Sequence, residues 1–131
     1  MKFFVEQVAL CPNDPKAAKE LLTAMGAVTW HEDYVKAEGK VFGCDAAPEA
    51  ELSFNYDILN ATELEILHYT TQDNWMTTGN RRNSVSHLGM HCTAEELVQW
   101  RIFFADRNIP VAQEVITKSH TNPAKIGRAH V

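Results

Sequence analysis

The sequence predicts an α+β fold made of paired βαβββ modules, of which the second is truncated at its C-terminal end. Two observations lead to this prediction. Residues 7–12 (Gln-Val-Ala-Leu-Cys-Pro) and residues 87–92 (His-Leu-Gly-Met-His-Cys) each combine an apolar strand pattern with a helix start that follows it. In each copy a polar side chain that can bind a metal, Gln7 or His87, interrupts the apolar pattern. We therefore expect two similar halves whose polar strand residues meet at their junction.

The first module begins with a strand pattern over residues 3–11, and a helix start follows it directly. Asp14 can accept hydrogen bonds from free amide groups of the first helical turn, and Pro15 suits that turn. Gly26 suits the left-handed residue that ends a helix. Apolar segments between turn residues then predict the remaining strands, at residues 28–35, 40–44, 51–56 and 62–69.

The second module begins after a polar connector and repeats the strand-helix opening. Residues 85–92 have a strand pattern, and Thr93 with Glu96 forms a capping box that starts the next helix. The segment Asn108-Ile109-Pro110 ends that helix, and residues 111–117 predict one more strand. The pattern stops there, so the two strands that would complete a second βαβββ unit are missing.

These elements predict a single domain with four parts. The last six residues, Ile-Gly-Arg-Ala-His-Val, match what a widely used sequencing adapter encodes in one reading frame, so we expect the tail to be non-native. A natural basic tail is the alternative. The expected parts are the first module at 1–70, a linker at 71–83, the incomplete second module at 84–124 and the non-native tail at 125–131.

Composition excludes several classes of function. The chain has 131 residues, 45% of them apolar, and a formal net charge of −5. An acidic chain lacks the basic surface that nucleic-acid binding requires. No apolar run approaches the roughly 18 residues that span a membrane, and Lys2 and Glu6 interrupt the N-terminus too early for a secretory signal. We therefore expect a cytoplasmic protein, in which the three cysteines are reduced and lie in the core.

Three polar side chains stand on strand faces where apolar residues would be expected. Side chains alternate between the two faces of a strand, so Gln7, Glu65 and His87 each oppose an apolar face. A carboxylate on a concave sheet face is costly unless it is paired, hydrated or bound to a cation. This pattern motivates a metal site, with Glu63 as the alternative to Glu65 because both share one face. Each residue also has a non-functional alternative: Gln7 as a surface glutamine, Glu65 as a solvated carboxylate and His87 as a hydrogen-bonded core histidine.

The chain resembles the vicinal oxygen chelate superfamily, which includes glyoxalase I, bleomycin-resistance proteins and extradiol dioxygenases. The resemblance covers about residues 3–117. It rests on residues 7–10 before a helix that ends at Gly26, on residues 63–67 and on residues 86–90. In that family, paired βαβββ modules curve around a cavity that holds a divalent metal. The ligands that the resemblance implies are Gln7 in place of the commoner histidine, Glu65 and His87, whereas the family's fourth ligand has no counterpart.

The resemblance is closest to glyoxalase I and implies a metal-dependent lyase or isomerase that acts on a small oxygenated substrate through an enediolate. Glu65 would be a ligand and the catalytic proton carrier. Mixed nitrogen and oxygen ligation suits zinc, nickel, manganese or iron without selecting one of them. We expect zinc or nickel first, with manganese or iron as alternatives. The substrate could be a glutathione adduct, whose carboxylate Arg81 and Arg82 could bind, although a solvated linker pair is the alternative. The family also implies a homodimer.

Two other functions remain open at this point. One is a metal-free antibiotic-binding protein of the bleomycin-resistance type, in which the cavity sequesters a small molecule. The other is an extradiol-type dioxygenase with iron, which would need a second histidine ligand. A carboxylate at the fourth ligand position would favour an enzyme, and an apolar residue or lysine there would favour binding alone.

Overall fold

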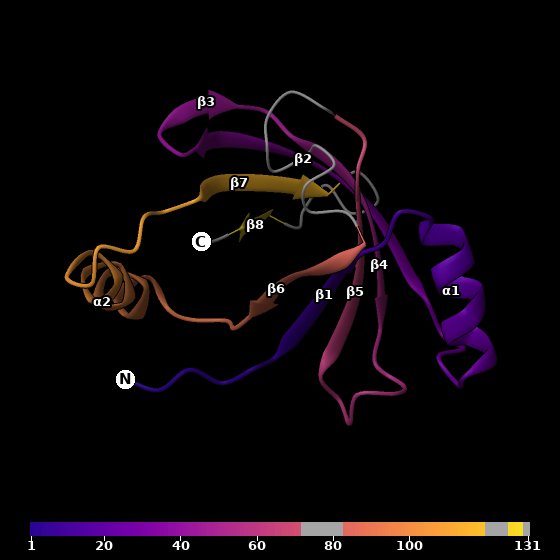
Figure 1. Ribbon diagram of the computed structural model, residues 1–131. Coiled ribbons are helices and arrows are strands. Elements are labelled where there is room, and N and C mark those ends of the chain that lie inside the picture. Colours follow the sequence, from indigo (N-terminus) through magenta and orange to yellow (C-terminus); the bar gives the residue numbers. More distant parts are fainter. Residues whose placement is uncertain (72–82, 120–125, 130–131) are drawn as a thin grey trace.

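The computed structural model describes residues 1–71, 83–119 and 126–129 and confirms an α+β fold, with one curled sheet and two helices (Figure 1). In these residues the sheet has eight strands in the order β6-β1-β5-β4-β2-β7-β8, and β3 pairs with β2. The elements are β1 (Gln7–Cys11), α1 (Pro15–Ala24), β2 (His31–Val41), β3 (Cys44–Ala46), β4 (Glu49–Asn55), β5 (Glu63–Tyr69), β6 (Ser84–Gly89), α2 (Ala94–Ala105), β7 (Gln113–Ser119) and β8 (Ile126–Ala129).

Strand β1 lies between β5 and β6, and this placement determines the candidate site. β1 runs parallel to β5 and antiparallel to β6. Parallel neighbours need a long crossover connection, which here is the segment from α1 to β4. The opening strands of the two halves, β1 and β6, are therefore hydrogen-bonded neighbours, although about 80 residues separate them in the sequence.

The helix ends agree with the sequence prediction. The Asp14 side chain accepts a hydrogen bond from the backbone N–H of Ala17 at 3.0 Å and caps α1. Gly26 follows α1 with φ at 115°, a conformation that favours glycine. Thr93 and Glu96 form both hydrogen bonds of the capping box at the start of α2. Local sequence thus determines where both helices begin.

The predicted break between the strands at 28–35 and 40–44, at Glu38-Gly39, is wrong. β2 continues through these residues as one strand of 11 residues. Gly39 pairs with Val115 of β7, and a Cβ atom at position 39 would collide with the backbone carbonyl of Glu114. The glycine therefore permits close approach of two strands instead of ending one. The turn lies at Phe42 and Gly43, whose φ angles of 46° and 77° suit a two-residue hairpin.

Strand boundaries in the second half also differ from the prediction. β6 ends at Gly89, three residues before the predicted end, and β7 runs to Ser119. The short strand β8 was not predicted, and it pairs with the outer edge of β7. Backbone pairing on a free strand edge needs no alternating side-chain pattern, so no strand pattern marks residues 126–129. Most of the predicted linker, residues 72–82, lies outside the described residues.

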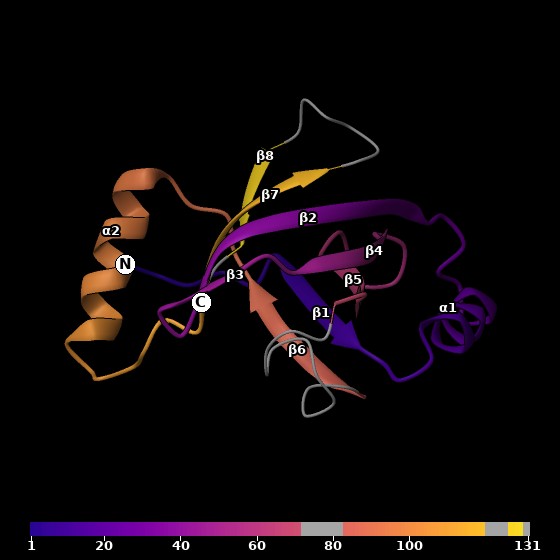
Figure 2. The ribbon, with the colours of Figure 1, turned by 90° about the horizontal axis from the view of Figure 1, so that it is seen from above.

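The two helices lie at opposite ends of the sheet, as both ribbon views show (Figures 1 and 2). Leu88 of β6 is 52% exposed, so the described helices do not cover this residue. α2 has no buried residue and instead meets the N-terminal segment, where the Trp100 and Phe3 ring centroids are 6.3 Å apart. None of the described helices is long and apolar enough to cross a membrane.

The described core lies on the sheet and consists mainly of aliphatic side chains, including Ala9, Leu64, Ile66, Leu67 and Val115. All three cysteines are free thiols. Cys11 is buried, as predicted, but Cys44 is exposed on the short strand β3, so the prediction that every cysteine lies in the core is wrong. Among the described strands, β3 pairs only with the end of β2.

Candidate metal centre

The candidate centre forms where β5, β1 and β6 lie side by side. Ala9 of β1 pairs with Glu65 on one side and with His87 on the other. Neighbouring strands are about 4.8 Å apart, so these two residues lie two strand spacings apart, on either side of Ala9. Ala9 is fully buried and has only a methyl group, which leaves room for the longer side chains of Glu65 and His87 to meet above it.

The structure brings all three predicted ligands together. His87 Nε2 lies 2.8 Å from Gln7 Oε1 and 3.8 Å from the Glu65 Oε2 atom. Two ligand atoms that share an ion at about 2.1 Å are separated by roughly 3.0 to 3.4 Å, depending on coordination geometry. The separations of His87 Nε2 from the two oxygens bracket this range, so small side-chain movements would bring His87 Nε2 and each of these oxygens within reach of one ion.

Gly89 provides the space that Gln7 occupies. The two residues are paired across β1 and β6. A Cβ atom at position 89 would lie 2.8 Å from Gln7 Oε1 and 3.1 Å from Gln7 Cβ. Any side chain at this position would therefore displace the amide that faces His87. The glycine of the His-Leu-Gly segment has a direct role in the geometry of the centre.

Glu65 is the most perturbed acid of the centre. Its side chain is only 7% exposed. Burial, with a smaller contribution from the nearby charge of Glu63, raises the pKa of Glu65 to about 7. A buried carboxylate pays a large desolvation cost when it ionises, and a bound cation offsets this cost. The chemistry of this residue therefore fits a divalent ion.

Two further residues extend the centre: Glu63, which was predicted as the alternative to Glu65, and Tyr56. Glu63 Oε1 accepts a hydrogen bond from Gln7 Nε2 at 2.5 Å, and Glu63 Oε2 accepts one from the Tyr56 hydroxyl. Burial and this contact raise the pKa of Tyr56 to about 12, which keeps the hydroxyl protonated. The shared strand face of Glu63 and Glu65 was a sequence signal for Glu63, whereas nothing in the sequence indicated that Tyr56 contacts Glu63.

His87 has a second contact that bears on its protonation. Ser86 Oγ lies 3.2 Å from His87 Nδ1. A hydroxyl can donate or accept, so it can serve either tautomer of the imidazole. A metal on Nε2 requires the proton to lie on Nδ1, from which it would be donated to Ser86. The contact thus supports the ring orientation that places Nε2 toward Gln7 and Glu65.

The donor set is weaker than that of a typical metal site. Among the described residues, no three His, Cys, Asp or Glu side chains gather as a possible ion site. The centre has one carboxylate and one imidazole, and its third donor is the amide oxygen of Gln7. A carboxylate, an imidazole and an amide oxygen together suit ions that accept mixed nitrogen and oxygen ligation, such as zinc, nickel, manganese or iron.

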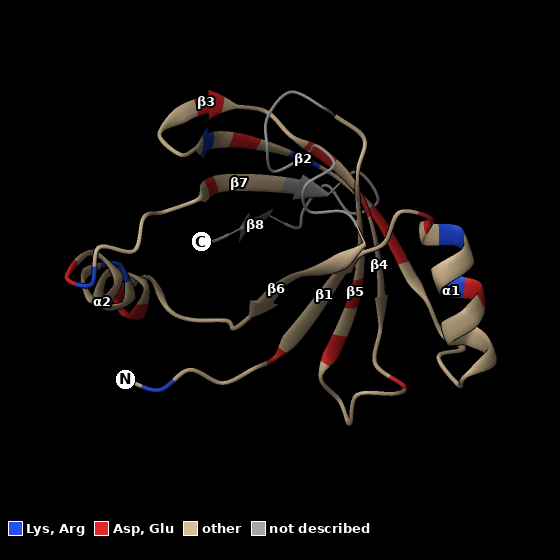
Figure 3. Ribbon diagram, viewed as in Figure 1, with Lys and Arg blue, Asp and Glu red and all other residues tan. Residues whose placement is uncertain are grey.

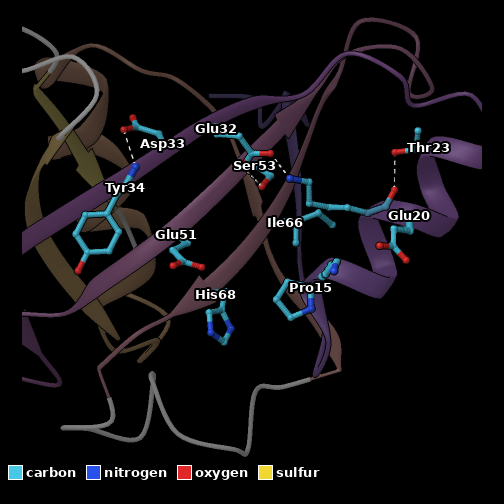
Figure 4. Close-up of a pocket in the computed structure, with 12 residues that line it drawn as sticks. Pro15, Glu20, Thr23, Glu32, Asp33, Tyr34, Glu51, Ser53, Ile66 and His68 are labelled. Atoms are coloured by element: carbon cyan, nitrogen blue, oxygen red, sulfur yellow. Dashed lines mark hydrogen bonds and ion pairs between the residues drawn. The ribbon is translucent and has the colours of Figure 1, made fainter.

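Two hollows lie near this part of the sheet. The smaller, about 360 Å³ in volume, has Tyr56 and Glu63 in its lining and is therefore next to Gln7. We call it the Tyr56 hollow. The larger, about 790 Å³, lies between α1 and the opposite sheet face, where Glu51, Ser53 and His68 line it (Figure 4). We call it the α1 groove, and its lining includes none of the three predicted ligands.

Acidic residues recur along the strands, while Lys and Arg are found mainly on the helices, on β2 and near the N-terminus (Figure 3). The sheet thus offers an environment that favours a cation over an anion. The predicted anion-binding residues, Arg81 and Arg82, lie outside the described residues.

Comparison of the chain with protein-family models, with curated proteins and with solved structures found no match.

Proposed function

We propose that this protein is a glyoxalase-like, metal-dependent lyase or isomerase of the vicinal oxygen chelate type, acting on a small oxygenated substrate. The observation that carries the proposal is that Gln7, Glu65 and His87 converge from three strands. His87 Nε2 lies 2.8 Å from Gln7 Oε1 and 3.8 Å from Glu65 Oε2. The order of elements from β1 to β5 supports a first βαβββ module, with β3 as an added hairpin strand. By the same resemblance, we propose a homodimer.

The residues have distinct roles in this proposal. Gln7 and His87 hold the ion, and a divalent ion such as zinc or nickel would polarise a substrate oxygen and stabilise negative charge. Glu65 holds the ion and exchanges a proton with the carbon next to the substrate carbonyl. Burial raises the pKa of Glu65 to about 7 in the metal-free protein, and a bound cation lowers it, so Glu65 would be an ionised base in the loaded site. The Tyr56 hollow offers space for a small substrate beside Gln7.

The test combines metal uptake with a general assay for proton abstraction. Chelator-treated protein is dialysed against zinc, nickel, manganese or iron, and bound metal is measured by elemental analysis. Metal-loaded protein is then incubated in D₂O with α-hydroxy aldehydes, α-hydroxy ketones and hemithioacetals, and exchange of the carbon-bound hydrogen is followed by NMR. We expect a single ion per chain and exchange or isomerisation of at least one substrate class.

Two variants make the assay specific. Glu65→Gln should lose exchange, because an amide cannot accept the substrate proton. Glu51→Gln, an exposed glutamate on the opposite face of the sheet, should leave metal uptake and exchange unchanged. Absence of metal uptake would refute the proposal. Metal uptake without exchange on any substrate would favour a small-molecule binding protein of the bleomycin-resistance type instead.

A further inference from the structure

We propose that Glu63, held in place by Tyr56, is a positioning residue that turns the carbonyl oxygen of Gln7 toward the metal position. The inference rests on the proposed metal site and assigns a function to two residues that are not ligands. An amide is a weak ligand whose oxygen and nitrogen ends have nearly the same shape. A glutamine ligand therefore needs a neighbour that decides which end faces the ion.

The hydrogen bonds of the centre fix this choice. An ionised carboxylate can only accept hydrogen bonds, so the Gln7 end that meets Glu63 must be the NH₂ group. Gln7 Nε2 donates to Glu63 Oε1 at 2.5 Å, and Gln7 Oε1 consequently lies 2.8 Å from His87 Nε2. If the amide rotated by half a turn, its NH₂ group would face the ion and could not bind it.

Tyr56 limits the movement of Glu63 in turn. Its hydroxyl donates to Glu63 Oε2, so each oxygen of that carboxylate has its own donor. The Tyr56 ring also contacts the His31 ring, with centroids 6.0 Å apart. The backbone register supports the same arrangement, because Gln7 and Glu63 are direct partners across β1 and β5. Glu63 is thus oriented from two sides, because each of its oxygens accepts a hydrogen bond from a different side chain.

The experiment measures cobalt affinity, because cobalt(II) replaces zinc in most sites and its visible spectrum reports the ligand set. Chelator-treated wild-type protein, Glu63→Gln, Tyr56→Phe, Gln7→Glu and the double variant Gln7→Glu/Glu63→Gln are titrated with cobalt(II). Thermal unfolding of each metal-free protein is measured in parallel. Affinities are compared only among variants whose metal-free unfolding remains cooperative.

We expect Glu63→Gln to weaken cobalt binding about tenfold, as the loss of an orienting partner typically does. Gln7→Glu should also weaken it, because two carboxylates would then face each other. The double variant exchanges the two groups and should bind cobalt within a few-fold of wild type. Tyr56→Phe should weaken binding several-fold.

Three results would overturn the inference. Glu63→Gln could bind cobalt as tightly as wild type, or the double variant could bind as weakly as the single variants. Tyr56→Phe could bind more tightly, which would indicate that Glu63 is itself a ligand that Tyr56 restrains. These results refute the positioning role alone, since wild-type protein still binds the ion. Failure of wild-type protein to bind cobalt would refute the metal site and this inference together.

Discussion

The perturbed acid Glu65 should make the metal-free protein less stable as the pH rises, and Glu65→Gln should remove this dependence. Burial raises the pKa of Glu65 in the folded state, whereas the unfolded chain ionises at the ordinary value. Below pH 4.5 the group is protonated in both states and has no effect on stability. As the pH rises from 4.5 to about 7, the unfolded state loses the proton first, and the free energy of unfolding falls.

The size of the effect follows from the two pKa values. Each pKa unit corresponds to about 1.4 kcal/mol, so a rise from 4.5 to about 7 costs the metal-free fold about 3 kcal/mol above pH 7. Relative to wild type, Glu65→Gln should therefore gain about 3 kcal/mol between pH 4 and pH 8. The other titrating groups are common to both proteins, so the difference between the two isolates Glu65.

The assay is urea unfolding in the presence of chelator, followed by tryptophan fluorescence and circular dichroism at half-unit steps from pH 4 to pH 8.5. Glu51→Gln is the matched control, because Glu51 is an exposed glutamate on the same sheet. Its stability curve should run parallel to that of wild type. Parallel curves for Glu65→Gln and wild type over the whole range would show that Glu65 titrates normally and would refute the reasoning.

Three further substitutions probe the packing that forms the centre. Gly89→Ala should weaken metal binding about tenfold with little loss of stability, because the added Cβ displaces the Gln7 side chain. A calorimetric titration measures the affinity, and an unchanged value would contradict the close contact between Gly89 and Gln7. Ala9→Leu should abolish metal binding, because the larger side chain fills the space above β1, and metal uptake by a folded variant would argue against this. Gly39→Ala should destabilise the fold by roughly 1 to 3 kcal/mol, because its Cβ meets the backbone of Glu114 in β7; wild-type stability in urea unfolding would show that the strands can separate without cost.

Local sequence signals were enough to predict much of the fold. Asp14 and Thr93 were identified as helix caps because a cap depends on a few neighbouring residues. Gly39 was misread as a turn, since its role depends on β7, which lies more than 70 residues away in the sequence. The unpredicted strand β8 likewise depends on a partner edge that local alternation does not reveal.

The candidate centre was predictable to a similar extent. Strand alternation and the family resemblance identified Gln7, Glu65 and His87, and the register around Ala9 brings their side chains together. The role of Tyr56 could not be predicted, because its contact with Glu63 depends on how the end of β4 lies against β5. Contacts that depend on three-dimensional geometry require the structure.

The central claim is that one divalent ion contacts Gln7, Glu65 and His87 at the same time. Crystals of the protein soaked with zinc or manganese allow the most direct test, because an anomalous difference map locates the ion independently of the protein atoms. We predict one strong peak within about 2.0 to 2.3 Å of Gln7 Oε1, a Glu65 oxygen and His87 Nε2. A map without a peak there, or with the ion held by other residues, would contradict the claim.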